Sequence, residues 1–194
     1  APDGDAFDHP AGNGAGGVDI TSSGRGFAGG NTVQGNYIGT DVTGVFDLGN
    51  AFDGVAINAN TNNVIGGLTP GAGNVIAFNG GDGVRAGNFY YGTLVVNTAI
   101  LSNSIHDNSG PGIDLNYGAR NPVSSPVLTS AFRSGTSTVV QGQFFAAPDT
   151  TYKLQFFSNL SPYFTGSGQG ETLVGNAPVT TDATGAARFS VTLP

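Results

Sequence analysis

Three short sequence elements recur in a fixed order through the first 115 residues, and this repeat limits the possible folds more than any other feature. The first element, a glycine followed by an alternating apolar run, begins at Gly17, Gly54, Gly83 and Gly112. The second begins at Asn31, Asn62 and Asn97, and the third begins at Gly35, Gly73 and Ser102. Short alternating runs bounded by Gly or Asn are typical of strands that end in tight turns. Three such strands per repeat predict the coils of a parallel β-helix.

Equivalent side chains of successive coils stack on one another in such a fold. We therefore expect one parallel sheet, in register and with side chains in a shared core, to contain Val18, Val55, Val84 and Ile113. One coil cannot bury its apolar face alone, so about three coils are needed for stability, and the chain has about that number.

Asparagine recurs at one place of the third element, at Asn36, Asn74 and Asn103. We interpret these residues as a stacked amide ladder inside the coil, because amides can satisfy the backbone groups of the turns. A row of residues that binds a saccharide is the weaker interpretation.

The repeat ends near Arg120, where the Pro- and Ser-containing residues 121–126 predict a linker. Longer strands are expected after it, at residues 127–132, 138–145, 151–158, 171–180 and 186–193. Residues 182–185 predict a hairpin turn between the last two of these strands. We expect two domains: a β-helix with an irregular N-terminal segment over residues 1–120, and a small antiparallel β-sandwich over residues 121–194.

The strings NTVQGNYIGTDVTG (31–44), NNVIGG (62–67) and GAGNVIAFNGGDGV (71–84) resemble repeats of secreted bacterial proteins with pectate-lyase-like right-handed β-helices. The tail, from TTYKLQFFSN (150–159) to TTDATGAARFSVTLP (180–194), resembles the sandwich module that often follows such repeats. This resemblance implies a short right-handed parallel β-helix and a secreted protein. It implies no reaction, because such proteins include lyases, hydrolases and adhesins.

Charge and composition restrict the partners. The net charge is −7 and only six Lys and Arg are present, so we expect neither nucleic-acid binding nor attraction to anionic membranes. No apolar run reaches the roughly 20 residues that a membrane span needs. The chain has no Cys and no Met, which suits an oxidising, extracellular location. A start without Met fits either trimming after export or a fragment.

Residues suited to acid–base catalysis are scarce. The one Glu, Glu171, and the one Lys, Lys153, both lie in the predicted sandwich, and Arg25, Arg85 and Arg120 are far apart in the repeats. Catalysis by a lyase or hydrolase needs two groups poised across the substrate. The sequence therefore favours a chain without catalytic activity.

Two further arrangements of residues offer groups suited to catalysis. Asp19 and Asp114 hold equivalent repeat positions, but Ala56 and Arg85 fill that position between them, which excludes a continuous acidic ladder. The side chains of His106 and Asp107 should diverge, because adjacent strand residues point to opposite faces. We therefore interpret His106 as a solvated turn residue.

Two groups of residues are candidate binding sites. Asp41, Asp47 and Asp53 share one inserted loop and could bind calcium, but the EF-hand spacing is absent, which favours a role in turns. No other cofactor is expected. The aromatic residues Phe89, Tyr90 and Tyr91 could stack on sugars or anchor a partner, or could cover the junction between the domains.

We expect an extracellular structural or adhesive module, with self-association into fibres or a glycan or cell-surface partner. The open end of a β-helix needs a cap, and residues 1–16, with Phe7 as the main bulky side chain, make a weak one over Val18 and Ile20. A second copy could cover this end. The alternatives are a polysaccharide-active enzyme and a carbohydrate-binding module on the same scaffold.

Overall fold

The computed structural model describes residues 13–21, 29–58, 61–87, 95, 97–115, 125–161 and 168–194. These residues form strands β1 to β15 and no helix, so the expected all-β class is confirmed. Accordingly, this part of the chain has no helix long and apolar enough to cross a membrane. The chain forms two compact units. The N-terminal unit is Ala1–Arg120 with Asn159–Thr172, and the C-terminal unit is Asn121–Ser158 with Leu173–Pro194.

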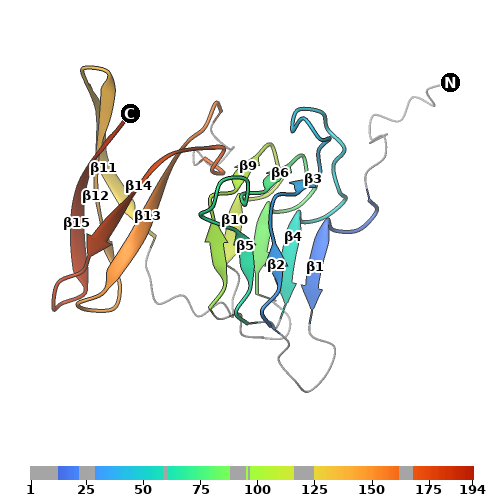
Figure 1. The fold of residues 1–194 in the computed structure, drawn as a ribbon, viewed down its shortest axis with the longest axis horizontal. Coiled ribbons are helices and arrows are strands. Elements are labelled where there is room, and N and C mark those ends of the chain that lie inside the picture. Colours follow the sequence, from blue (N-terminus) through green and yellow to red (C-terminus); the bar gives the residue numbers. More distant parts are fainter. Residues whose placement is uncertain are drawn as a thin grey trace. The chain divides into compact units, whose positions relative to one another are not determined.

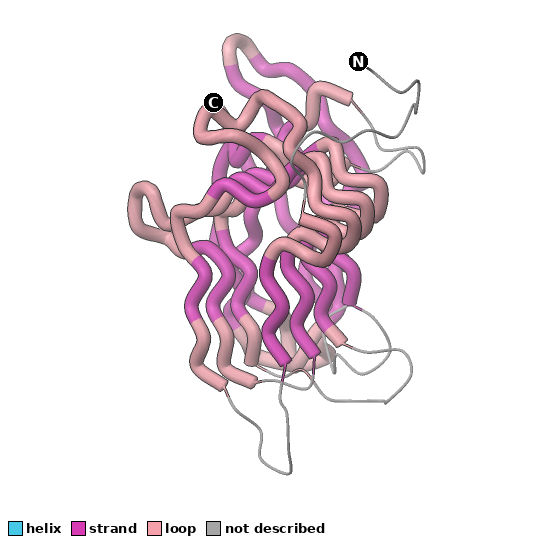
Figure 2. Tube along the Cα trace, turned by 90° about the vertical axis from the view of Figure 1, so that its right-hand side faces the viewer, coloured by secondary structure: helices cyan, strands magenta, loops and turns pink. Residues whose placement is uncertain are grey.

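Three parallel sheets form the N-terminal unit (Figure 1). The first sheet, in spatial order, holds β1 (Val18–Thr21), β4 (Val55–Asn58), β7 (Val84–Ala86) and β10 (Ile113–Leu115). The second holds β2 (Thr32–Val33), β5 (Val64–Gly66) and β8 (Ala99–Leu101), and the third holds β3 (Tyr37–Ile38), β6 (Val75–Ala77) and β9 (Ser104–His106). We call each successive set of three strands a rung, and β10 begins a fourth. Figure 2 shows the strands of successive rungs side by side, an arrangement compatible with a parallel β-helix.

The predicted register of the first sheet is confirmed. Val18 pairs with Val55, Val55 with Val84, and Val84 with Ile113. Val55 and Val84 are fully buried, and Val18 packs against the same core. The expected burial of Ile113 is wrong, because its side chain is 44% exposed. Its strand is the last of the sheet and pairs only with β7, so no described strand covers it from the other side.

The predicted amide ladder is confirmed. The Nδ2 of Asn36 donates to the Oδ1 of Asn74 at 3.1 Å, and the Nδ2 of Asn74 donates to the Oδ1 of Asn103 at 2.8 Å. Each accepting Oδ1 also receives the backbone N–H of the preceding asparagine, at 3.0 Å in both cases. Asn74 is only 1% exposed and Asn103 is also buried, so these residues serve the interior and not a saccharide-binding surface.

A second ladder was not predicted from the sequence. It runs from Asn50 to Asn79 and Asn108, with Nδ2 to Oδ1 distances of 2.7 and 2.8 Å. The Oε1 of Gln169 accepts the backbone N–H of Asn108 at 3.0 Å, as the asparagine of a following rung would. The Nε2 of Gln169 donates to the carbonyls of Asn108 and Gly110, both at 2.7 Å. Gln169, from Asn159–Thr172, therefore ends this ladder.

Two sheets form the C-terminal unit. One holds β11 (Val127–Ser134), β12 (Ser137–Phe145) and β15 (Ala186–Leu193), and the other holds β13 (Thr151–Ser158) and β14 (Thr172–Thr180). The pairs β11–β12 and β12–β15 are antiparallel, as predicted. One hydrophobic core contains residues from both sheets, among them Phe144, Phe156 and Phe189.

The turn at residues 182–185 forms, but it does not close a hairpin. The Oδ1 of Asp182 accepts the N–H groups of Thr184 and Ala186, and Gly185 has a φ of 82°. The strands on either side belong to different sheets, so the turn carries the chain from one sheet to the other. The hairpin was predicted from local turn chemistry alone, which does not determine the strand with which β15 pairs.

Replacing Asn74 should destabilise the protein more than replacing Asn36 in the same ladder. Asn74→Ala leaves buried donors and acceptors without partners, and we expect it to lower the free energy of unfolding by about 3 kcal/mol. Asn36 is exposed at the first rung, so Asn36→Ala should cost less than about 1 kcal/mol. Denaturant unfolding measures both values. Equal losses would contradict the structural role of the buried ladder.

Candidate functional site

The loop after β3 is held in shape by a single carboxylate. The Oδ1 of Asp41 accepts the backbone N–H groups of Val45 and Phe46, both at 3.2 Å, and the hydroxyl of Thr43 at 2.8 Å. Desolvation raises the pKa of Asp41, but the hydrogen bonds within the loop together lower it below its usual value. An isolated antiparallel β-bridge between the backbones of Thr40 and Asp47 closes the loop. Asp41 is therefore ionised at neutral pH and braces the turn.

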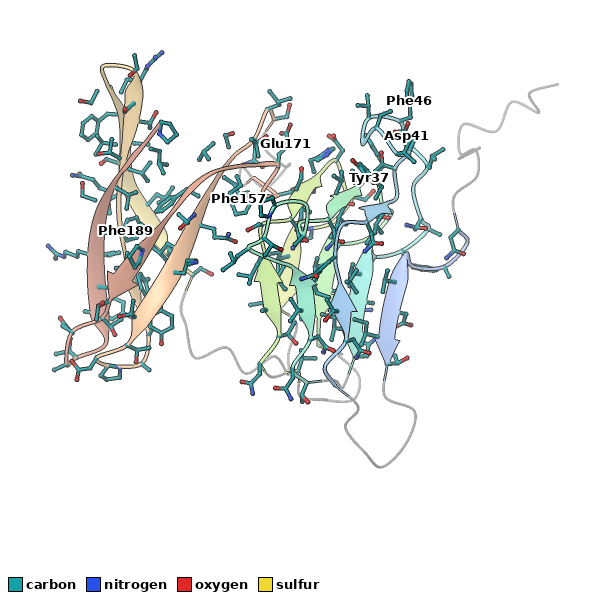
Figure 3. All side chains as sticks on the ribbon, in the orientation of Figure 1. Tyr37, Asp41, Phe46, Phe157, Glu171 and Phe189 are labelled. Carbon is teal, nitrogen blue, oxygen red and sulfur yellow. The ribbon has the colours of Figure 1, made fainter. Side chains whose placement is uncertain are left out.

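Large apolar side chains project from this braced loop. Val42 is 82% exposed, Val45 and Phe46 are each 67% exposed, and Tyr37 of β3 is 50% exposed. Figure 3 shows Phe46 at the outer end of the loop, with Asp41 and Tyr37 at its base. A Cβ added to Gly44 would lie 3.6 Å from the ring of Tyr37, so the loop packs over that ring. We call Tyr37, Val42, Val45 and Phe46 the loop patch.

The loop patch was not predicted from the sequence, in which the candidate site of this loop was its three carboxylates. The string VTGVF between Asp41 and Asp47 places three large apolar residues around a glycine. A turn offers little room to bury such residues, and this was the available signal. Clustered exposed apolar side chains mark interaction surfaces more often than single ones do.

The three predicted calcium ligands have separate partners. The Oδ1 of Asp47 accepts the N–H of Gly49 at 2.9 Å, a turn contact like those of Asp41. The Oδ2 of Asp53 instead forms an ion pair with the Nε of Arg85 at 2.6 Å, which neither interpretation predicted. Among the residues that the structure describes, no three His, Cys, Asp or Glu side chains form a group that could hold a metal ion. Calcium binding by these residues therefore gains no support.

Arg85 is at the centre of a second group of charges. Register pairing places Asp114 beside Arg85 on the first sheet, as their repeat positions predicted. The Nη1 of Arg85 also donates to the Oδ1 of Asn58 at 3.2 Å. Burial, together with the negative charges of Asp53 and Asp114, raises the pKa of Asp82 to about 6, and the positive charge of Arg85 partly offsets these effects.

The backbone of the following rung also contributes to the raised pKa of Asp82. The Oδ1 of Asp53 accepts the backbone N–H of Asp82, which occupies the same position one rung later, at 2.9 Å. The residue one rung after Asp82 is Pro111, as the parallel bonds from Gly54 to Asp82 and from Gly83 to Pro111 show. Proline has no N–H to donate, so the Asp82 carboxylate lacks the hydrogen bond that would favour its charged form.

The expected divergence of His106 and Asp107 is wrong. The Nδ1 of His106 lies 2.8 Å from the Oδ2 of Asp107. Asp107 follows β9 and has a φ of 52°, so the alternation of an extended strand does not apply to it. The ring of Phe78 meets that of His106 edge to face, with centroids 5.9 Å apart.

The predicted aromatic site of Phe89, Tyr90 and Tyr91 lies outside the described residues. Residues 1–12 of the proposed N-terminal cap lie outside them as well. Comparison of the sequence with protein families and with curated proteins finds no match in either. The candidate sites therefore rest on the geometry of this chain alone.

Asp82→Asn should stabilise the protein at neutral pH and have little effect in acid. The pKa of Asp82 is raised in the folded state, so its ionisation removes stability as the pH rises from about 4 to about 6. Because the side chain is partly exposed, we expect a gain of about 1 kcal/mol at pH 7 that vanishes below pH 4. Denaturant unfolding across this range tests the prediction. A constant difference between the two proteins at all pH values would contradict it.

Proposed function

We propose that this protein is an extracellular structural or adhesive module whose copies associate through the loop patch. We further propose that its three parallel sheets form a short right-handed β-helix of about three coils, like those of the secreted bacterial proteins that the repeats resemble. In this proposal the rungs are a rigid scaffold, and contact is made by side chains on the loops that project from it.

The observation that carries the proposal is the loop patch. Its four side chains expose a large apolar surface to water, which is unfavourable unless a partner covers it. Asp41 holds the loop in shape before any partner binds, so association would lose less conformational entropy. The side chains of Val42, Val45 and Phe46 are apolar and uncharged. They therefore suit an apolar surface on a partner protein better than a polar glycan.

The ladders also support a structural role. A side-chain amide oxygen of the following position accepts the backbone N–H of each of Asn74, Asn79 and Asn108. The repeated polar residues of the ladders therefore stabilise the fold and are not needed to explain a binding surface. Arg85 is held by Asp53 at 2.6 Å, and an ion-paired guanidinium is a poor base.

Phe46→Ser should weaken self-association without unfolding the protein. The side chain is exposed, so its loss removes apolar contact area between copies and little from the core. We expect sedimentation velocity to show concentration-dependent association of the unaltered protein, and at least a tenfold weaker association for Phe46→Ser.

Phe132→Ser is the control, because Phe132 is also an exposed phenylalanine, at 50%, but lies on β11 of the C-terminal unit. It should associate like the unaltered protein. The proposal fails if the unaltered protein stays monomeric at its highest soluble concentration, or if both variants weaken association equally.

The second candidate function is cleavage of an extracellular polysaccharide. It is favoured by the group around Asp82, whose raised pKa of about 6 suits a general acid beside the carboxylates of Asp53 and Asp114. Such an enzyme would release reducing ends or unsaturated products from pectin-like, alginate-like or neutral glycans. Loss of that release in Asp114→Asn or Arg85→Gln would favour this function over the adhesive one.

A further inference from the structure

A third amide ladder begins beside the second sheet. The Nδ2 of Asn31 donates to the Oδ1 of Asn63 at 2.9 Å, and the backbone N–H of Asn31 donates to the same oxygen at 3.2 Å. The same two contacts join Asn74 to Asn103 in the first ladder. Asn63 is fully buried, with 0% of its surface exposed. Its own amide therefore needs a hydrogen-bond acceptor in the next rung.

The next rung has a threonine where this ladder requires an asparagine. Val64 pairs with Ala99, and the N–H of Ala99 donates to the carbonyl of Asn63 at 2.9 Å, so Thr98 is the residue one rung after Asn63. The Oγ1 of a threonine is bonded to Cβ, whereas the Oδ1 of an asparagine lies one bond further out. Among the described residues, neither the buried Nδ2 of Asn63 nor the buried Oγ1 of Thr98 has a hydrogen-bond partner. Two unsatisfied polar atoms thus lie at one step of the ladder.

The chemistry of these two atoms indicates what can join them. The Nδ2 of Asn63 only donates hydrogen bonds, so it requires an acceptor and cannot bind a metal cation. The Oγ1 of Thr98 both accepts and donates. An anion is unsuitable, because a buried charge needs a paired charge and neither side chain supplies one. A small neutral molecule that both accepts and donates fits the two atoms, and water is the smallest such molecule.

We propose that one buried water molecule bridges Asn63 and Thr98 and completes the third ladder. Its oxygen accepts the Nδ2–H and the backbone N–H of Asn63, as the Oδ1 of Asn103 does for Asn74. One of its hydrogens is donated to the Oγ1 of Thr98, which gives the water the number of hydrogen bonds that is usual for a buried one. The water thereby replaces the amide oxygen that an asparagine at position 98 would supply. This site does not depend on the loop patch or on the proposed function.

Thr98→Val removes one partner of the water and leaves the shape of the side chain nearly unchanged. If the water is bound, it loses its acceptor, and the folding equilibrium constant of the full chain, measured by denaturant unfolding, should fall by about fivefold. Without the water, the same change would remove an unsatisfied polar atom and leave the constant equal or higher. Thr32→Val is the matched control, because Thr32 is exposed in the same sheet, and it should change the constant by less than about twofold.

High-resolution crystal structures of the unaltered protein and of Thr98→Asn locate the water directly. In the unaltered protein we expect one ordered water within about 3 Å of both the Nδ2 of Asn63 and the Oγ1 of Thr98. In Thr98→Asn the new Oδ1 should take the place of this water and accept from Asn63, as in the other ladders. The proposal is overturned if no ordered water contacts Asn63, if the Nδ2 of Asn63 donates directly to Thr98, or if Thr98→Val is as stable as the unaltered protein.

Discussion

The N-terminal unit depends on one interaction, the hydrogen bond from an asparagine amide to the asparagine one rung later. In the ladder of Asn36, Asn74 and Asn103, each accepting Oδ1 receives both a side-chain N–H and a backbone N–H of the preceding rung, as Asn103 does for Asn74. A buried amide without hydrogen-bond partners lowers the free energy of unfolding by about as much as several favourable contacts raise it. Each rung therefore stabilises the next only when the asparagine is present. The ladders thereby fix the register that also aligns Val55, Ile65 and Ile76 in the core.

The last asparagine of a ladder needs a hydrogen-bond partner that does not come from the repeats. At Asn108 the partner is Gln169, whose side chain is one methylene longer and comes from Asn159–Thr172. The backbone of this segment takes part too, because the N–H of Ile105 donates to the carbonyl of Gly170 at 3.0 Å. The chain thus covers the third rung with a segment whose Gln169 lies 61 positions away in sequence from Asn108.

Much of the architecture was predictable because it repeats. The spacing of the glycine and asparagine elements predicted the parallel register, and Asn36, Asn74 and Asn103 predicted one ladder. The role of Gln169 was not predictable, because it has no counterpart in the repeats and lies in the part assigned to the sandwich. The contact of His106 with Asp107 depends on a positive φ, which no residue pattern indicated. The loop patch, in contrast, was visible in the sequence as apolar residues within a turn.

Gln169→Ala, followed by amide hydrogen exchange at single residues, tests the ladder account most directly. If the amide of Gln169 completes the ladder, the backbone N–H of Asn108 should exchange at least tenfold faster in the variant. The N–H of Asn79, one rung earlier, should change less, and that of Asn74, in the other ladder, should be unaffected. An unchanged rate at Asn108, or an equal increase at all three residues, would contradict the account.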